Sequence, residues 1–112
     1  MSQDNSNNSL QSRIEKLNAM LVLQPEDCFL LHAKGLELLK LNKTLEALQS
    51  FQEVIRVNEL YVGTYYHLAR CFELLQRFDE AIETYKKGIL VATKVKDMHA
   101  RNELLMALEE IE

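Results

Sequence analysis

The sequence predicts an all-α protein built from repeated pairs of helices. The stretch Phe78–Tyr85 has an earlier counterpart in Leu45–Phe51, at a spacing of 34 residues. Nine pairs of residues of similar size share this spacing: Leu31/Tyr65, Gly35/Ala69, Leu38/Phe72, Leu41/Leu75, Glu46/Glu80, Ala47/Ala81, Leu48/Ile82, Phe51/Tyr85 and Ile55/Ile89. A fixed period of this length is typical of repeat architectures. The 112 residues include only one Pro and three Gly, which favours helices throughout.

The chain starts with a polar stretch that precedes a first amphipathic helix. Residues 1–9 contain no apolar side chain after Met1, so burial cannot offset the entropy of ordering them, and we expect a disordered tail. Apolar residues at helical spacing then predict a helix that starts at Ser9 or Ser12 and ends near Leu23. Its apolar face comprises Leu10, Ile14, Leu17 and Leu21.

Five further helices follow in order. Pro25 suits the first turn of a second helix that runs to about Leu41. Asn42 can take the left-handed conformation that ends this helix, whereas the later turn at residues 76–77 is weakly marked because it lacks Gly. The third, fourth and fifth helices are expected at about 45–57, 61–75 and 78–94. A sixth helix, about 97–111, departs from the repeat and has one apolar stripe, as a terminal cap should.

Composition narrows the functional classes. A net charge of −4 argues against nucleic-acid binding, which needs clustered Lys and Arg. No apolar run approaches the roughly 20 residues that cross a membrane. Two Cys that lie 43 residues apart, in a chain without an export signal, predict reduced thiols and a cytoplasmic location.

The repeated residues resemble those of the tetratricopeptide repeat family, whose unit is a helix–turn–helix of 34 residues. The marks of the resemblance are small residues at Gly35, Ala69, Ala47, Ala81 and Gly88, and aromatic residues at Phe51 and Tyr85. The Pro that usually closes a repeat is replaced by Glu59 and Thr93 but is present as Pro25, so the first helix looks like the second half of a preceding repeat.

The resemblance implies a right-handed superhelix of about six helices in a single domain over residues 10–112. Its expected parts are a half repeat (10–24), a first repeat (25–60), a second repeat (61–95) and a capping helix (96–112).

The resemblance also implies a protein–protein interaction module or scaffold. In the family, the first helices of successive repeats line a concave groove that takes an extended peptide or a partner helix. The groove of this chain would be lined by Phe29, His32, Ala33, Leu36, Leu39, Tyr66, His67, Arg70 and Glu73. We expect apolar burial to supply affinity, and Arg70 with the two histidines to select an acidic or C-terminal group. The histidine charge would make binding weaker above a pH of about 7.

Some members of the family hold the C-terminal carboxylate of a chaperone with Lys and Asn on these helices. This chain has His32, Leu36 and His67 at the corresponding positions, so we do not expect this clamp.

Other functions remain as alternatives. The stack could associate into a homo-oligomer without a separate ligand, because the second helix is apolar over more than half of its circumference. Two Cys/His pairs, Cys28/His32 and His67/Cys71, have the composition of a zinc site, but not the close Cys spacing in short loops, so we expect no metal. No phosphate-binding loop or nucleophile motif occurs, and we expect neither an enzyme nor a cofactor.

Overall fold

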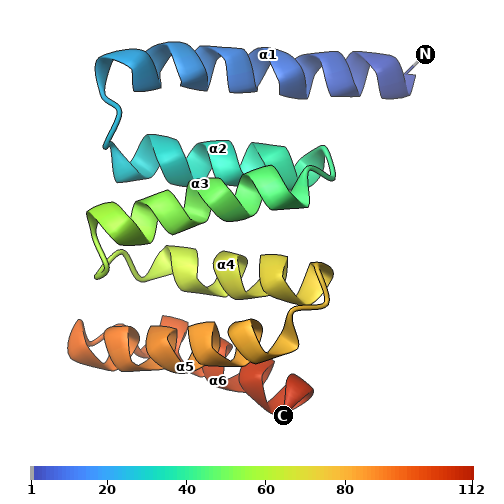
Figure 1. Cartoon of the computed structure of the whole chain (residues 1–112). Coiled ribbons are helices and arrows are strands. Elements are labelled where there is room, and N and C mark those ends of the chain that lie inside the picture. Colours follow the sequence, from blue (N-terminus) through green and yellow to red (C-terminus); the bar gives the residue numbers. More distant parts are fainter. Residues whose placement is uncertain (1) are drawn as a thin grey trace.

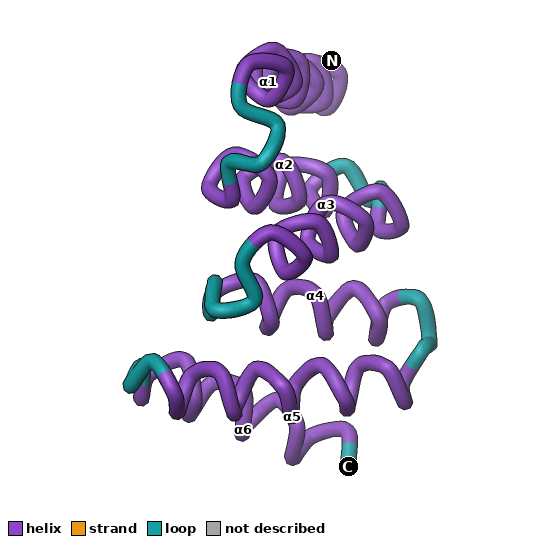
Figure 2. The backbone as a smooth tube through the Cα atoms, turned by 60° about the vertical axis from the view of Figure 1, so that its left-hand side comes forward, coloured by secondary structure: helices purple, strands orange, loops and turns teal. Residues whose placement is uncertain are grey.

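The computed structural model describes residues 2–112, with side chains from residue 8 onward, and this part of the chain consists of six α-helices joined by turns (Figure 1). The helices are α1 (Ser2–Leu23), α2 (Cys28–Lys40), α3 (Thr44–Val57), α4 (Gly63–Leu74), α5 (Phe78–Lys94) and α6 (Met98–Ile111). They follow one another as a stack, and the turns alternate between its two ends (Figure 2). The predicted all-α class and right-handed arrangement of helix pairs are confirmed.

The first helix is longer than the sequence predicted. It begins at Ser2, where we expected a disordered tail up to residue 9, and Met1 lies outside the described residues. No Pro or Gly occurs before Pro25, so no residue in this polar stretch is incompatible with helical geometry. The predicted end at Leu23 is confirmed.

The start of α2 corrects the expected role of Pro25. Pro25 lies in the turn before the helix and not in its first helical turn. The N-cap is Asp27, whose carboxylate accepts a hydrogen bond of 3.1 Å from the backbone N–H of Leu30. Asp97 caps α6 in the same way, with Ala100 as the donor at 3.0 Å. A carboxylate satisfies a free N–H at a helix start, and Pro has no such acceptor in its side chain.

Three helices end in the same left-handed turn. Asn42, Gln76 and Lys96 have φ angles of 60°, 60° and 63°. In each turn the next residue donates a backbone hydrogen bond to the carbonyl five residues earlier, as in Lys43 N to Leu38 O at 3.0 Å. This bond is characteristic of the Schellman motif, which satisfies free carbonyls at a helix end. The left-handed Asn42 is as predicted, and Gln76 adopts the same conformation although it is neither Asn nor Gly.

The core lies between successive helices. One buried cluster surrounds Phe51 and a second surrounds Tyr85, and both rings are fully buried. α3 packs against α2 and α4, and α5 packs against α4 and α6, whereas α1 packs mainly against α2. On one side of the stack a hydrogen bond joins α2 to α4, and α4 also touches α6. The helices α2, α4 and α6 therefore border a common surface, which we call the groove side.

Candidate functional site

The structure brings together three of the predicted groove residues. The His32 ring on α2 lies 5.4 Å from the His67 ring on α4, and the His67 ring lies 5.5 Å from that of Tyr66, measured between centroids. Phe29 is 71% exposed at the start of α2, while Leu36 is half-buried against the Phe51 cluster. On the groove side Tyr66 thus lies beside two packed histidines, and Phe29 is an exposed ring on the same helix as His32.

The histidines are part of the contact between the two repeats. His32 Nδ1 shares a hydrogen bond of 2.8 Å with the hydroxyl of Thr64, a fully buried residue at the start of α4. Burial lowers the pKa of His32, and the neighbouring His67 lowers it further. Burial also lowers the pKa of His67, although Glu103 opposes this shift. Both shifts favour the neutral ring, so the histidines are poorly suited to select an acidic group.

Arg70 and Glu73, the last two predicted groove residues, form an ion pair with each other. Arg70 Nη1 lies 3.1 Å from Glu73 Oε1, and the second carboxylate oxygen of Glu73 accepts a hydrogen bond from the hydroxyl of Tyr85. The Glu73 side chain is only 14% exposed, whereas that of Arg70 is 45% exposed. The positive charge of Arg70 is therefore largely balanced before any ligand arrives.

The sixth helix contributes residues that the sequence argument missed. Leu104 and Leu108 are buried, so the predicted apolar stripe is confirmed. The adjacent face of α6 meets α4 at two small cavities, and Tyr66 lines both. One cavity, of about 190 Å³, is lined by Val62, Gly63, Tyr66, His67, Ala100, Glu103 and Leu104. The other, of about 200 Å³, is lined by Tyr66, Glu103, Met106, Ala107 and Glu110.

A sequence signal for these α6 residues does exist. Residues 103, 106, 107 and 110 have the i, i+3, i+4, i+7 spacing of one helical face. Met106 lies on this face and is 66% exposed. The main apolar stripe of α6 explains its packing as a cap without this second face, so the spacing alone does not single it out.

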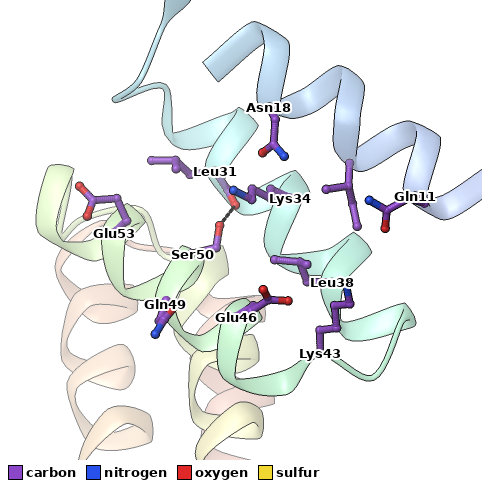
Figure 3. A pocket seen from close by; sticks show the side chains of 11 residues that line it. Gln11, Asn18, Leu31, Lys34, Leu38, Lys43, Glu46, Gln49, Ser50 and Glu53 are labelled. Carbon is purple, nitrogen blue, oxygen red and sulfur yellow. Dashed lines mark hydrogen bonds between the residues drawn. The ribbon is translucent and has the colours of Figure 1, made fainter. Parts of the chain in front are cut away.

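A larger cavity than these two lies elsewhere, and none of the predicted groove residues lines it. It has a volume of about 430 Å³ and is bordered by α1, α2 and α3 (Figure 3). Side chains of both charges line it: the positive ones are Lys34 and Lys43, and the negative ones are Glu46 and Glu53. At its base the Ser50 hydroxyl donates a hydrogen bond of 2.7 Å to the backbone carbonyl of Leu31. We call this space the outer cavity.

The two Cys/His pairs do not converge on a metal site. Among the side chains described, those of residues 8–112, no group of three or more His, Cys, Asp or Glu is placed to hold an ion. Cys71 is fully buried, and burial raises the pKa of its thiol to about 11, which opposes the thiolate that zinc requires. Cys28 Sγ lies instead 3.8 Å from the carbonyl oxygen of Val54, as a weak donor.

Among the described helices, none has the length and apolar character that crossing a membrane requires.

Comparison with known proteins is consistent with a helix–turn–helix repeat protein. The profile of the tetratricopeptide repeat family matches residues 62–94. The solution structure of a tetratricopeptide repeat domain protein from Salinibacter ruber is 41% identical to this chain, with a TM-score of 0.75; the match covers 79% of this chain and 89% of that protein. The chain therefore belongs to the tetratricopeptide repeat family, which is generally a non-enzymatic protein-interaction fold. No curated protein matches the sequence significantly.

Two more distant structures share the fold over nearly the whole chain. The TPR2B domain of yeast Sti1, in complex with pHsp70, has a TM-score of 0.86 at 16% identity, with coverage of 98% of this chain and 88% of that one. PcrH, in complex with the chaperone binding region of PopD, has a TM-score of 0.85 at 16% identity, with coverage of 97% and 83%. At this identity the likeness establishes the fold alone.

Proposed function

We propose that this chain is a non-enzymatic scaffold that holds a peptide or helix of a partner protein on the groove side. The observation that carries the proposal is the pair of exposed aromatic side chains on neighbouring first helices, Phe29 at 71% and Tyr66 at 38% exposure. Aromatic residues supply a large contact area at little cost in side-chain entropy and are enriched at binding hot spots. Two structural neighbours, the Sti1 domain and PcrH, were solved with protein partners, which supports this use of the fold.

The predicted site residues have different roles in this proposal. Phe29, Tyr66 and the exposed part of Arg70 would contact the partner directly. His32, His67, Leu36 and Glu73 would mainly hold those side chains in place, because each is already packed or bonded inside the stack. We further infer a cytoplasmic location from the two free thiols, Cys28 and Cys71.

A pull-down with purified protein tests the site. Tyr66→Ala/Arg70→Ala removes two groove-side residues, and Lys43→Ala/Gln49→Ala changes two exposed residues of the outer cavity as a matched control. We expect the wild type and the control variant to retain the same partner, and the groove variant to lose it while its circular dichroism is unchanged. Loss in the control alone would move the site to the outer cavity.

Self-association is the second candidate. Exposed apolar side chains at Val22 (80%), Leu23 (83%) and Leu90 (72%) lie outside the groove side and could be covered by another copy. Light scattering over a concentration series separates the two functions, since a monomer at every concentration excludes self-association.

A further inference from the structure

We infer that the section of the groove side between α4 and α6 takes a partner segment that presents an apolar side chain flanked by Lys or Arg. This inference rests on the proposed function, which places a peptide on the groove side, and it specifies the chemistry of that peptide. It reverses the acidic preference that the sequence suggested. The section is defined by Tyr66 on α4 and by Glu103, Met106, Ala107 and Glu110 on α6.

The apolar part of the section suits a single side chain. Its two cavities, of about 190 and 200 Å³, are smaller than the 300–1,000 Å³ or so that drug-sized ligands occupy. Tyr66 lines both, and Met106 offers a flexible thioether at 66% exposure. Unbranched Met side chains adapt their shape and are common at surfaces that bind peptides. An aliphatic or aromatic residue of the partner could therefore pack against Tyr66 and Met106.

The charge around this apolar part is negative. Glu103 and Glu110 line the cavities, and the residues that line them include neither Lys nor Arg. Residues 98–112 as a whole contain four Glu and one Arg. The other groups on the groove side do not reverse this sign, since Arg70 is paired with Glu73 and burial lowers the pKa of His32 and His67. Complementarity of charge thus favours a basic segment and disfavours an acidic one.

The expected size of the charge effect is modest. Glu103 is 57% exposed at its side chain and lies 3.6 Å from the more exposed His99, so its interactions are screened by water and salt. Loss of both carboxylates should weaken binding of a basic peptide by roughly 5- to 20-fold at low salt, and by less at high salt. Loss of the Tyr66 ring should have a larger effect, because it removes the apolar contact.

Selection from a random peptide library tests the inference. The wild-type protein is immobilised and the enriched peptides are sequenced. The best peptide is then titrated at low and high salt against wild type, Tyr66→Ala, Glu103→Gln/Glu110→Gln and the control Glu109→Gln. Glu109 is an exposed glutamate on the same helix that does not line either cavity.

The expected result is enrichment of Lys and Arg beside an apolar residue, weaker binding by the double variant, and no change in the control. Enrichment of Asp and Glu with loss of binding in Tyr66→Ala would overturn the basic preference while leaving the groove intact. Peptides that bind Tyr66→Ala as well as wild type would overturn both the inference and the proposed function. If Glu109→Gln weakened binding as much as the double variant does, the inference would also be overturned. Such a result would mean that the peptide responds to the net charge of α6 and not to the two glutamates that line the cavities.

Discussion

In the first full repeat, Leu31 and Val54 occupy the positions that Tyr65 and Gly88 occupy in the second. Both members of each pair are buried, so the larger first-helix residue is matched by the smaller second-helix residue. The geometry accounts for this exchange, because a Cβ atom at residue 88 would lie 2.7 Å from the Cβ of Tyr65. At this pair of positions the second repeat therefore needs Gly on its second helix because it has Tyr on its first.

One turn away lies a second pair of positions, 35/69 and 51/85, where the second repeat has the larger residue on both helices. Phe51 of the first repeat packs over Gly35, where an added Cβ would lie 2.6 Å from Phe51 Cζ. In the second repeat Tyr85 packs near Ala69, and its hydroxyl bonds to Glu73. Tyr65 likewise donates a hydrogen bond of 2.6 Å from its hydroxyl to the backbone carbonyl of Glu59. In the second repeat, hydrogen bonds from the hydroxyl groups thus hold both tyrosine rings in place.

Gly88→Val gives the second repeat the side chain of the first and should destabilise the protein by about 3 kcal/mol, because the Val side chain would overlap Tyr65 and Leu104. Adding Tyr65→Leu should recover about 1–2 kcal/mol of that loss, since it restores the volume of the first repeat. Urea denaturation of the two single variants and the double variant measures this coupling. Strict additivity would show that the two positions do not share one space.

Gly35→Ala should cost about 1–3 kcal/mol in unfolding free energy, because Phe51 is fully buried and its ring cannot move away without disturbing the surrounding core. Gly63→Ala is the matched control. No atom lies within 4 Å of a Cβ at residue 63, and Ala is the better helix former, so we expect no loss or a small gain. Thermal melts of the two variants compare them, and equal losses would contradict the role of close approach at Gly35.

The contact between the two repeats should weaken as the pH falls. The pKa values of His32 and His67 are lowered by burial in the folded state, below the ordinary value of about 6.5, so the unfolded chain takes up protons first. The stability they contribute is thus present above pH 6.5 and is lost as the pH falls below it. The groups that face them are each other, Thr64, Tyr61, Phe51, Tyr66 and Glu103.

Between pH 7.5 and pH 5 we expect a loss on the order of 1 kcal/mol, seen as a lower urea midpoint. His32→Gln should flatten this dependence. His99→Gln should not, because the His99 side chain is 87% exposed. A pH dependence that is the same in wild type and His32→Gln would exclude this origin.

The smallest effect is expected at the turns. Asn42 and Gln76 have the same φ of 60°, but Asn tolerates the left-handed conformation better than Gln. Gln76→Asn should therefore stabilise the second repeat by about 0.5 kcal/mol, and Asn42→Gln should destabilise the first by a similar amount. Differential scanning calorimetry of the two variants compares them. A change of the same sign in both would show that side-chain contacts, and not φ, set the preference.

Much of the fold could be predicted from the sequence because residues of similar size recur every 34 residues. The period located α2 to α5, and the bounds of α5 and the end of α1 were predicted to the residue. The start of α1 and the role of Pro25 were not, since a polar stretch and a proline are each compatible with more than one local conformation. The repeat period led to the proposed groove residues on α2 and α4. It did not lead to the cavity-lining residues of α6, because α6 does not follow the period.

The sequence by itself determined where the helices lie and that each pairs with its neighbour. Helical periodicity is a property of each segment alone, and small residues such as Gly35 and Ala81 let adjacent helices approach closely. The tertiary structure alone decided which side chains are buried, which are paired and which remain exposed. Burial depends on what packs against a residue from other helices, and this burial lowers the pKa of both histidines. The same packing pairs Arg70 with Glu73 and brings the glutamates of α6 beside Tyr66.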